Sequence, residues 1–207
     1  FYSLLRLFNA KKFINKSTSK HKRKNKLFFS EREMKKYHIL ARKVNGKKIS
    51  TFGEDRSGSV HVIYFHGGMY VVEGNTAHKR WLINLFNQAD CKITYVDYPL
   101  APEHTYRETI KMVVNSYQFL ADKYPHDNFI LMGDSAGGGL ALVLAQLLRD
   151  HGFEHSPGKL ILFSPWVRLD MDNPSITGFI SKDSILDLNL LRKSARAYGG
   201  SADLNDK

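Results

Sequence analysis

The sequence predicts an α/β fold in which helices cover both faces of a mostly parallel sheet. Short β-branched and aromatic runs alternate with longer helical patterns from residue 60 to residue 163. Strands separated by helices run parallel, because the chain must cross over before the next strand can pair. The 207 residues, of which 43% are hydrophobic, suffice for one domain with a sizeable core.

The expected elements follow two periodicities. Strands are expected over residues 60–65, 92–98, 129–132 and 159–163, and the β-branched and aromatic run 60–65 indicates a buried strand. Asn45-Gly46 is a hairpin turn signal, and residues 48–52 are expected to form the strand that follows it. Apolar residues at helical spacing predict helices over 75–87, 105–124, 136–149 and 184–198. Residues 170–177 are expected to form a loop.

The net charge of +11 is concentrated at one end of the chain. Residues 1–50 hold 16 of the 31 Lys and Arg residues and only two acids, whereas residues 51–207 are slightly acidic. Dense basic blocks such as Lys20 to Lys26 are usually solvated. The alternative is a tether of residues 1–30 to an anionic membrane or a nucleic acid. We favour a solvated face, and we expect no nucleic-acid partner.

Cysteine content and hydropathy limit the classes of protein to which this chain can belong. The single cysteine, Cys91, excludes an internal disulfide and gives no support to a zinc site. It opens an apolar run and is expected to be a buried strand residue. No apolar stretch approaches the ~18 residues of a membrane span. The apolar start, Phe1 to Phe8, lacks the basic region and cleavage site of a signal peptide, so a cytoplasmic protein is expected.

The segment Gly133-Asp134-Ser135-Ala136-Gly137 carries the main chemical signal. It matches G-x-S-x-G and lies between an expected strand and an expected helix, the context that a nucleophile elbow requires. Small flanking residues let the strand and helix backbones approach closely. An ordinary glycine-rich turn remains the alternative, but the combined pattern predicts Ser135 as a catalytic nucleophile.

A second segment, His66-Gly67-Gly68-Met69, follows the expected strand 60–65. Backbone N–H groups prearranged around a developing oxyanion are each worth ~3–4 kcal/mol. We therefore expect an oxyanion hole formed by Gly67, Gly68 and Met69 together with Ala136, which is helped by the dipole of its helix. His66 is expected to shape this turn. A flexible glycine loop is the alternative.

These two motifs and two further segments resemble the hormone-sensitive-lipase-like branch of the α/β-hydrolases. The further segments are Asp97-Tyr98-Pro99-Leu100-Ala101-Pro102-Glu103-His104 and Ser164-Pro165-Trp166. The motifs occur in the family's order and cover about residues 45–200. The resemblance implies the α/β-hydrolase fold, with residues 1–45 as a basic N-terminal cap segment. It implies a hydrolase core over 46–207, in which 170–200 form a cap-like loop and helix. It also implies hydrolysis of short-chain acyl esters without a cofactor or metal.

Two positions depart from the family pattern. Met69 stands where many members have a third glycine, and its backbone N–H still suits the oxyanion hole while its side chain narrows the acyl pocket. Pro99 stands where arginine is common, which affects loop packing but no catalytic role.

The base and acid of a triad are not apparent. The expected order in this fold is Ser, then Asp or Glu, then His, and only His151 and His155 follow Ser135. His151 lies sixteen positions along the expected helix, ~24 Å away, whereas a base must lie within ~3 Å. His104 is a poor alternative, and Asp170, Asp172, Asp183 and Asp187 follow no clear core strand.

We therefore expect the chain to stop before the catalytic Asp and His, and to be C-terminally incomplete. It is then expected to hydrolyse p-nitrophenyl acetate no better than its Ser135→Ala variant. The favoured function is a serine hydrolase of small acyl esters that forms an acyl-enzyme on Ser135. The alternatives are an amidase or peptidase and a non-catalytic ligand-binding member of the same fold. The sequence gives no oligomeric state.

Overall fold

A six-stranded sheet forms the centre of the protein. The structure is a computed structural model that describes residues 28–202, and its sheet has the order β1-β2-β4-β3-β5-β6. The strands are β1 (Leu40–Val44), β2 (Lys47–Phe52), β3 (Val60–Phe65), β4 (Lys92–Val96), β5 (Asn128–Asp134) and β6 (Lys159–Phe163).

Four of these strands are parallel and form the half of the sheet that carries the site. β4, β3, β5 and β6 run in one direction, whereas β1 and β2 form an antiparallel hairpin on the side of β4. Asn45 and Gly46 close the hairpin with φ angles of 48° and 75°, the conformation that the Asn-Gly signal predicts. Phe65 lies opposite both Val96 and Gly133, so β3, β4 and β5 reach the same edge together.

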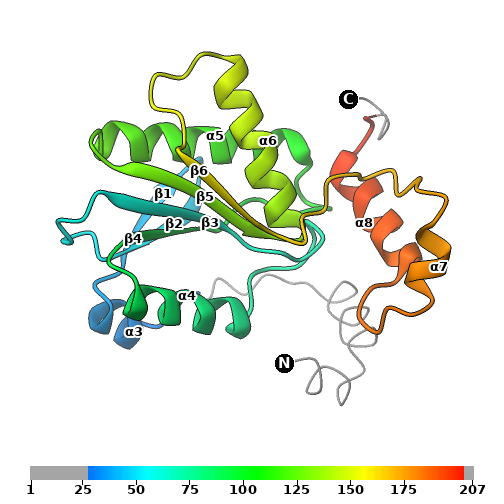
Figure 1. The fold of residues 1–207 in the computed structure, drawn as a ribbon, viewed down its shortest axis with the longest axis horizontal. Helices are drawn as coiled ribbons and strands as arrows, with labels where there is room; N and C mark the ends of the chain where they lie inside the picture. The colour runs from blue at the N-terminus through cyan, green and yellow to red at the C-terminus, as the bar shows by residue number, and fades with distance from the viewer. Residues whose placement is uncertain (1–27, 203–207) are drawn as a thin grey trace.

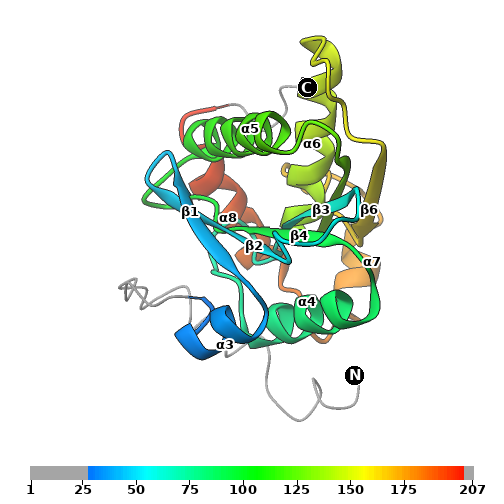
Figure 2. The same ribbon diagram turned by 90° about the vertical axis from the view of Figure 1, so that its left-hand side faces the viewer.

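Helices cover the two faces, which confirms the predicted fold class. α5 and α6 lie on one face and α3 and α4 on the other (Figures 1 and 2). α7 and α8 lie beyond the carboxyl ends of the parallel strands (Figure 1). The helices are α3 (Glu31–Lys36), α4 (Thr76–Gln88), α5 (Tyr106–Lys123), α6 (Ala136–Asp150), α7 (Ile176–Ile180) and α8 (Leu188–Gly199).

Each face of the sheet has its own apolar core. The core beneath α5 and α6 is built around fully buried residues such as Phe65, Tyr117 and Leu144. The core beneath α3 and α4 contains Phe52 and Leu82, together with the buried Cys91. At ~25 cal/mol per Å² of buried apolar area, these two layers dominate the favourable free energy of folding.

The structure adds two helices and a strand to the predicted elements. α3 and β1 lie within residues 1–45, and β1 belongs to the same sheet as the strands of the core. The division into 1–45 and 46–207 stays a prediction, and residues 1–27 with their basic block lie outside the described residues. α7 overlaps the end of the loop that we expected over 170–177.

The outer strand β6 is exposed along most of its length. Leu160, Ile161 and Phe163 are each more than a third exposed. In contrast, the hairpin strands at the other end of the sheet carry four cationic residues, Arg42, Lys43, Lys47 and Lys48. Among residues 28–202, no helix has the length and apolarity that crossing a membrane would take.

Candidate active site

Ser135 occupies a sharp turn between β5 and α6. β5 ends at Asp134 and α6 begins at Ala136, which leaves Ser135 alone between them with φ 49° and ψ −118°. A positive φ is uncommon for a residue that has a Cβ, and it costs on the order of 1–3 kcal/mol unless the surroundings enforce it. The structure therefore holds Ser135 in the strained conformation that an elbow requires.

Close backbone approaches explain the glycines around Ser135. A Cβ on Gly133 would lie 2.4 Å from the carbonyl carbon of Gly137, and a Cβ on Gly137 would lie 2.1 Å from the carbonyl oxygen of Phe65. Neither distance is possible for a real side chain. The first residues of α6 are thus pressed against the ends of β5 and β3.

Hydrogen bonds from the next segment hold the elbow in place. The Ser135 N–H donates to the carbonyl oxygen of Phe163 at 2.9 Å, and the Trp166 N–H donates to the Ser135 carbonyl oxygen at 2.8 Å. The Ser164-Pro165-Trp166 motif therefore contacts the elbow directly. Trp166 also lies near Tyr70, in the segment that follows β3, with ring centroids 5.8 Å apart.

We use the name oxyanion turn for residues 66–70, which follow β3. Gly68, Met69 and Tyr70 have φ angles of 138°, 56° and 61°. The Gly68 carbonyl oxygen accepts from the N–H groups of Val71 and Val72 at 3.0 and 2.8 Å. The N–H groups of Gly68 and Met69 have no acceptor within residues 28–202.

The Ala136 N–H is the third such donor. It belongs to the first turn of α6, where helix geometry gives an N–H no partner, and none is present in the part of the chain that the structure describes. The helix dipole adds partial positive charge at the same point. Gly68, Met69 and Ala136 are therefore suited to bind an oxyanion.

Gly67 differs from the other three predicted donors. Its N–H donates to Oδ1 of Asp134 at 2.9 Å, so that group is already occupied. A Cβ on Gly67 would lie 2.3 Å from the same carboxylate, which explains why glycine is required there. In this structure Gly67 joins the oxyanion turn to the elbow.

The Asp134 carboxylate has two further donors. The Tyr64 hydroxyl donates to Oδ1 at 2.5 Å, and Nε2 of His78 lies 3.4 Å from Oδ2. Burial raises the pKa of Asp134, but the contacts with His78, Tyr64 and Gly67 outweigh burial and hold the pKa below its usual value. Asp134 is therefore ionised at neutral pH. Burial, together with this charge, raises the pKa of Tyr64.

His66 is buried within the turn, as expected for a shaping residue. Its ring is 0% exposed and stacks on the ring of Tyr98 with centroids 4.4 Å apart. Its Nδ1 lies 2.8 Å from the carbonyl oxygen of Gly67, and its own carbonyl oxygen accepts from the Tyr98 hydroxyl at 2.5 Å. These contacts connect the oxyanion turn to the loop that follows β4.

The two histidines that follow Ser135 in the sequence lie away from it. His151 is the C-cap of α6, at the opposite end of the helix from Ser135, and His155 follows it in the next loop. Between residues 28 and 202, no histidine forms a hydrogen bond with the Ser135 hydroxyl. The roles of the catalytic Asp and His therefore remain unassigned.

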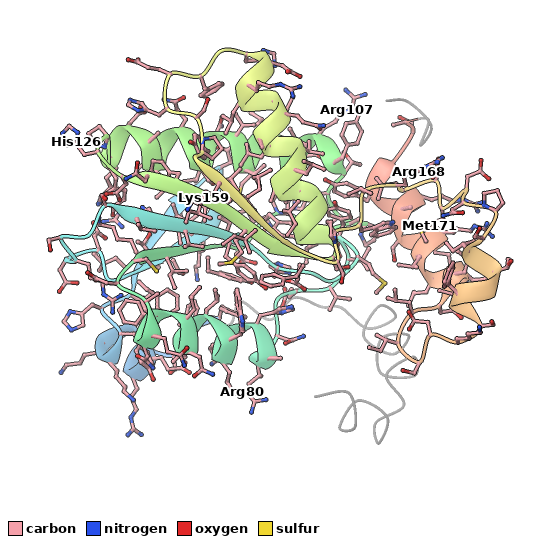
Figure 3. All side chains as sticks on the ribbon, in the orientation of Figure 1. Arg80, Arg107, His126, Lys159, Arg168 and Met171 are labelled. Carbon is pink, nitrogen blue, oxygen red and sulfur yellow. The ribbon has the colours of Figure 1, made fainter. Side chains whose placement is uncertain are left out.

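Three of the four aspartates between residues 170 and 187 have local structural roles. Asp170 pairs with Arg168, Asp183 accepts from the N–H groups of residues 185 and 186, and Asp187 caps α8. Arg168 and Met171 lie on the segment between β6 and α7 (Figure 3). Residues 28–202 contain no group of three or more His, Cys, Asp or Glu that could hold a metal ion.

The fold and the elbow define an α/β protein with a serine at a strand-to-helix turn. Comparisons with known proteins identify the same fold class. The family described as alpha/beta hydrolase fold matches residues 62–207. An esterase of Acinetobacter venetianus is 30% identical over 156 residues, which are 75% of this chain and 50% of that protein. An acetyl-hydrolase of Streptomyces hygroscopicus is 30% identical over 143 residues, 69% of this chain and 48% of that protein.

A solved structure has the same fold. A hormone-sensitive lipase from a metagenome library superposes with a TM-score of 0.77 at 25% identity, covering 99% of this chain and 69% of that one. The chain belongs to the alpha/beta hydrolase fold family, and its resemblance to the hormone-sensitive-lipase-like branch is confirmed. It spans about half the length of the two sequence relatives.

Proposed function

We propose that this chain carries the nucleophile and the oxyanion hole of a carboxylic ester hydrolase that acts on small acyl esters. The observation that carries the proposal is the strained conformation of Ser135, together with three backbone N–H groups at the same end of the sheet that have no acceptor within residues 28–202. Such strain persists where the surroundings enforce it, often at active sites. The named relatives are an esterase and an acetyl-hydrolase.

The proposed reaction passes through an acyl-enzyme. The Ser135 hydroxyl attacks the ester carbonyl, its proton passes to a general base, and the carbonyl oxygen becomes an oxyanion. The N–H groups of Gly68, Met69 and Ala136 stabilise that oxyanion. The alcohol then leaves, and water releases the acid from Ser135. Met69 is buried in the oxyanion turn, which supports a narrow acyl pocket and a short acyl group.

Covalent labelling tests the nucleophile without requiring turnover. A fluorophosphonate probe is expected to add once per chain, at Ser135, as measured by intact mass and peptide mapping. Because the catalytic base is expected to lie outside this chain, labelling is expected to be slow and is followed over hours at excess probe. The Ser135→Ala variant is the control and should carry no adduct.

Two results would redirect the proposal. A wild-type chain that stays unlabelled while it is folded would favour the non-catalytic binding alternative. Hydrolysis of p-nitrophenyl acetate at a hundredfold or more above the Ser135→Ala rate would mean that these residues include a base. Comparing p-nitrophenyl acetate with the matching anilide separates an esterase from an amidase.

A further inference from the structure

The Asp134 carboxylate lies where the two halves of the proposed oxyanion hole meet. Asp134 immediately precedes Ser135, and Gly67 immediately precedes Gly68. Oδ1 accepts from the Gly67 N–H at 2.9 Å and from the Tyr64 hydroxyl at 2.5 Å. Oδ2 faces only the ring of His78 among the hydrogen-bond donors of residues 28–202. This carboxylate therefore links the elbow to the turn through a hydrogen bond.

The contacts of His78 determine which ring nitrogen carries the proton. Its Nδ1 lies 3.0 Å from the backbone N–H of Asn75, the N-cap of α4, and must act as the acceptor there. A neutral imidazole has one N–H, so that proton lies on Nε2. Nε2 is 3.4 Å from Oδ2 of Asp134 and donates toward it. The start of α4 is thereby tied to the elbow.

This arrangement fixes the rotation of the carboxylate. Tyr64 and Gly67 donate to one oxygen, and His78 donates toward the other. Without His78 the carboxylate can rotate about its Cβ–Cγ bond and change the direction of the Gly67 N–H contact. Donors of an oxyanion hole must stay within about 0.5 Å of their working position, so such a movement lowers reactivity.

We propose that His78 is a positioning residue for the oxyanion hole, holding Asp134 so that Gly67 sets the oxyanion turn against Ser135. His78 acts through Asp134 and does not touch the reacting atoms. The inference rests on the proposed function for its effect on reactivity. The effect of His78 on the position of Gly67 does not depend on the proposed function and is tested separately.

Two substitutions separate positioning from helix capping. In His78→Gln the side-chain amide nitrogen reaches the place of Nε2, which keeps the donor toward Asp134 and loses the acceptor for Asn75. In His78→Asn the shorter amide oxygen replaces Nδ1, which keeps the acceptor and loses the donor. A capping role predicts that only the glutamine variant is impaired, whereas the positioning role predicts the reverse.

The first readout is the rate of fluorophosphonate labelling at Ser135. His78→Asn is expected to label about tenfold more slowly than wild type, and His78→Gln within about twofold, a smaller loss than the 10²–10³ for removal of a whole donor. The second readout is the amide proton shift of Gly67 by NMR, recorded with Ser135→Ala as the background. It should move in His78→Asn toward its value in Asp134→Asn, and stay in place in His78→Gln.

The outcomes distinguish the two proposals. If wild type is not labelled, the proposed function fails, while the Gly67 shift still decides the role of His78. An unchanged Gly67 shift in His78→Asn overturns the positioning role. Nitrogen NMR of the wild-type ring at neutral pH needs no variant and guards against misfolding, because a proton found on Nδ1 overturns the proposal as well.

Discussion

At the scale of single residues, backbone strain at Ser135 and the packing around it depend on each other. Ser135 has φ 49°, and its N–H and carbonyl are fixed by Phe163 and Trp166. Three parts of the chain therefore enforce one unfavourable conformation. The free energy stored there lowers the stability of the fold.

This strain predicts that Ser135→Gly is more stable than Ser135→Ala. Glycine adopts a positive φ without steric cost but loses more entropy on folding, so the net gain is about 1 kcal/mol. For a chain of this size that corresponds to ~2–4 °C in melting temperature. Thermal unfolding of both variants measures this difference in melting temperature.

Ser116 provides the control for that comparison, because it lies inside α5, where the backbone is helical. Glycine there should be about 1 kcal/mol less stable than alanine. Equal stability of the two Ser135 variants would contradict the strain argument.

Sequence reasoning found the residue types of the site but not their pairing. Gly67, Gly68 and Met69 were grouped by the glycine motif, yet only the structure shows that the Gly67 N–H is bound by Asp134. That contact depends on β3 and β5 being neighbours, which no local pattern contains. Tyr64 and His78 were missed for the same reason.

At the scale of elements, capping signals and periodicity located most helices and strands. Asn75 caps α4, and strands β3 and β6 have the predicted bounds. α3 was missed although its capping box, Ser30 with Glu33, is readable as S-x-x-E. The surrounding basic charge obscured that signal. α7 has five residues and no side-chain cap, so no local signal marks it.

Helix α8 packs against the oxyanion turn, and this contact leads to a second prediction. The ring of Tyr198 on α8 is almost fully buried and stacks on Tyr70 with centroids 3.9 Å apart. Tyr198→Ala is expected to lower the free energy of unfolding by about 3 kcal/mol, as other truncations of buried aromatic residues do. Urea unfolding measures this loss. It should also slow labelling of Ser135, since Tyr70 belongs to the oxyanion turn.

Tyr198→Phe is the matched variant, because it keeps the stacked ring and removes only the hydroxyl. We expect it to lose no more than about 1.5 kcal/mol. Equal losses in the alanine and phenylalanine variants would mean that the hydroxyl, and not the stacking, connects α8 to the turn.

At the scale of the whole molecule, the strand order brings distant segments to one edge. β3 lies between β4 and β5, so the segments after all three strands meet at the carboxyl edge. The alternation of strands and helices predicted a parallel sheet but not this order. The opposite, amino-terminal edge carries a buried polar network. His61 is 0% exposed there, with Nδ1 3.1 Å from Asp127 and Nε2 2.7 Å from Thr94.

This network predicts that acid destabilises the protein through His61. Burial lowers the pKa of His61 from 6.5 to about 4, against the opposing pull of Asp127. Between these values the unfolded chain binds the proton and the folded chain does not, so the free energy of unfolding rises with pH from about 4 to 6.5. The contribution is complete above pH 6.5, is lost below pH 4, and amounts to roughly 3 kcal/mol.

Urea unfolding at intervals across that pH range tests the argument with two variants. His61→Gln cannot titrate but retains an amide near Thr94, so its stability should change less between pH 4 and pH 6.5 than that of wild type. His126→Gln is the control, because His126 is exposed at the end of the molecule far from α8 (Figure 3). A pH dependence that is the same in His61→Gln as in wild type would assign the acid sensitivity to carboxylates. Glu54 is expected to add acid sensitivity mainly below pH 4.5, because burial raises its pKa but Arg42 and Lys123 outweigh burial and lower the pKa to about 2.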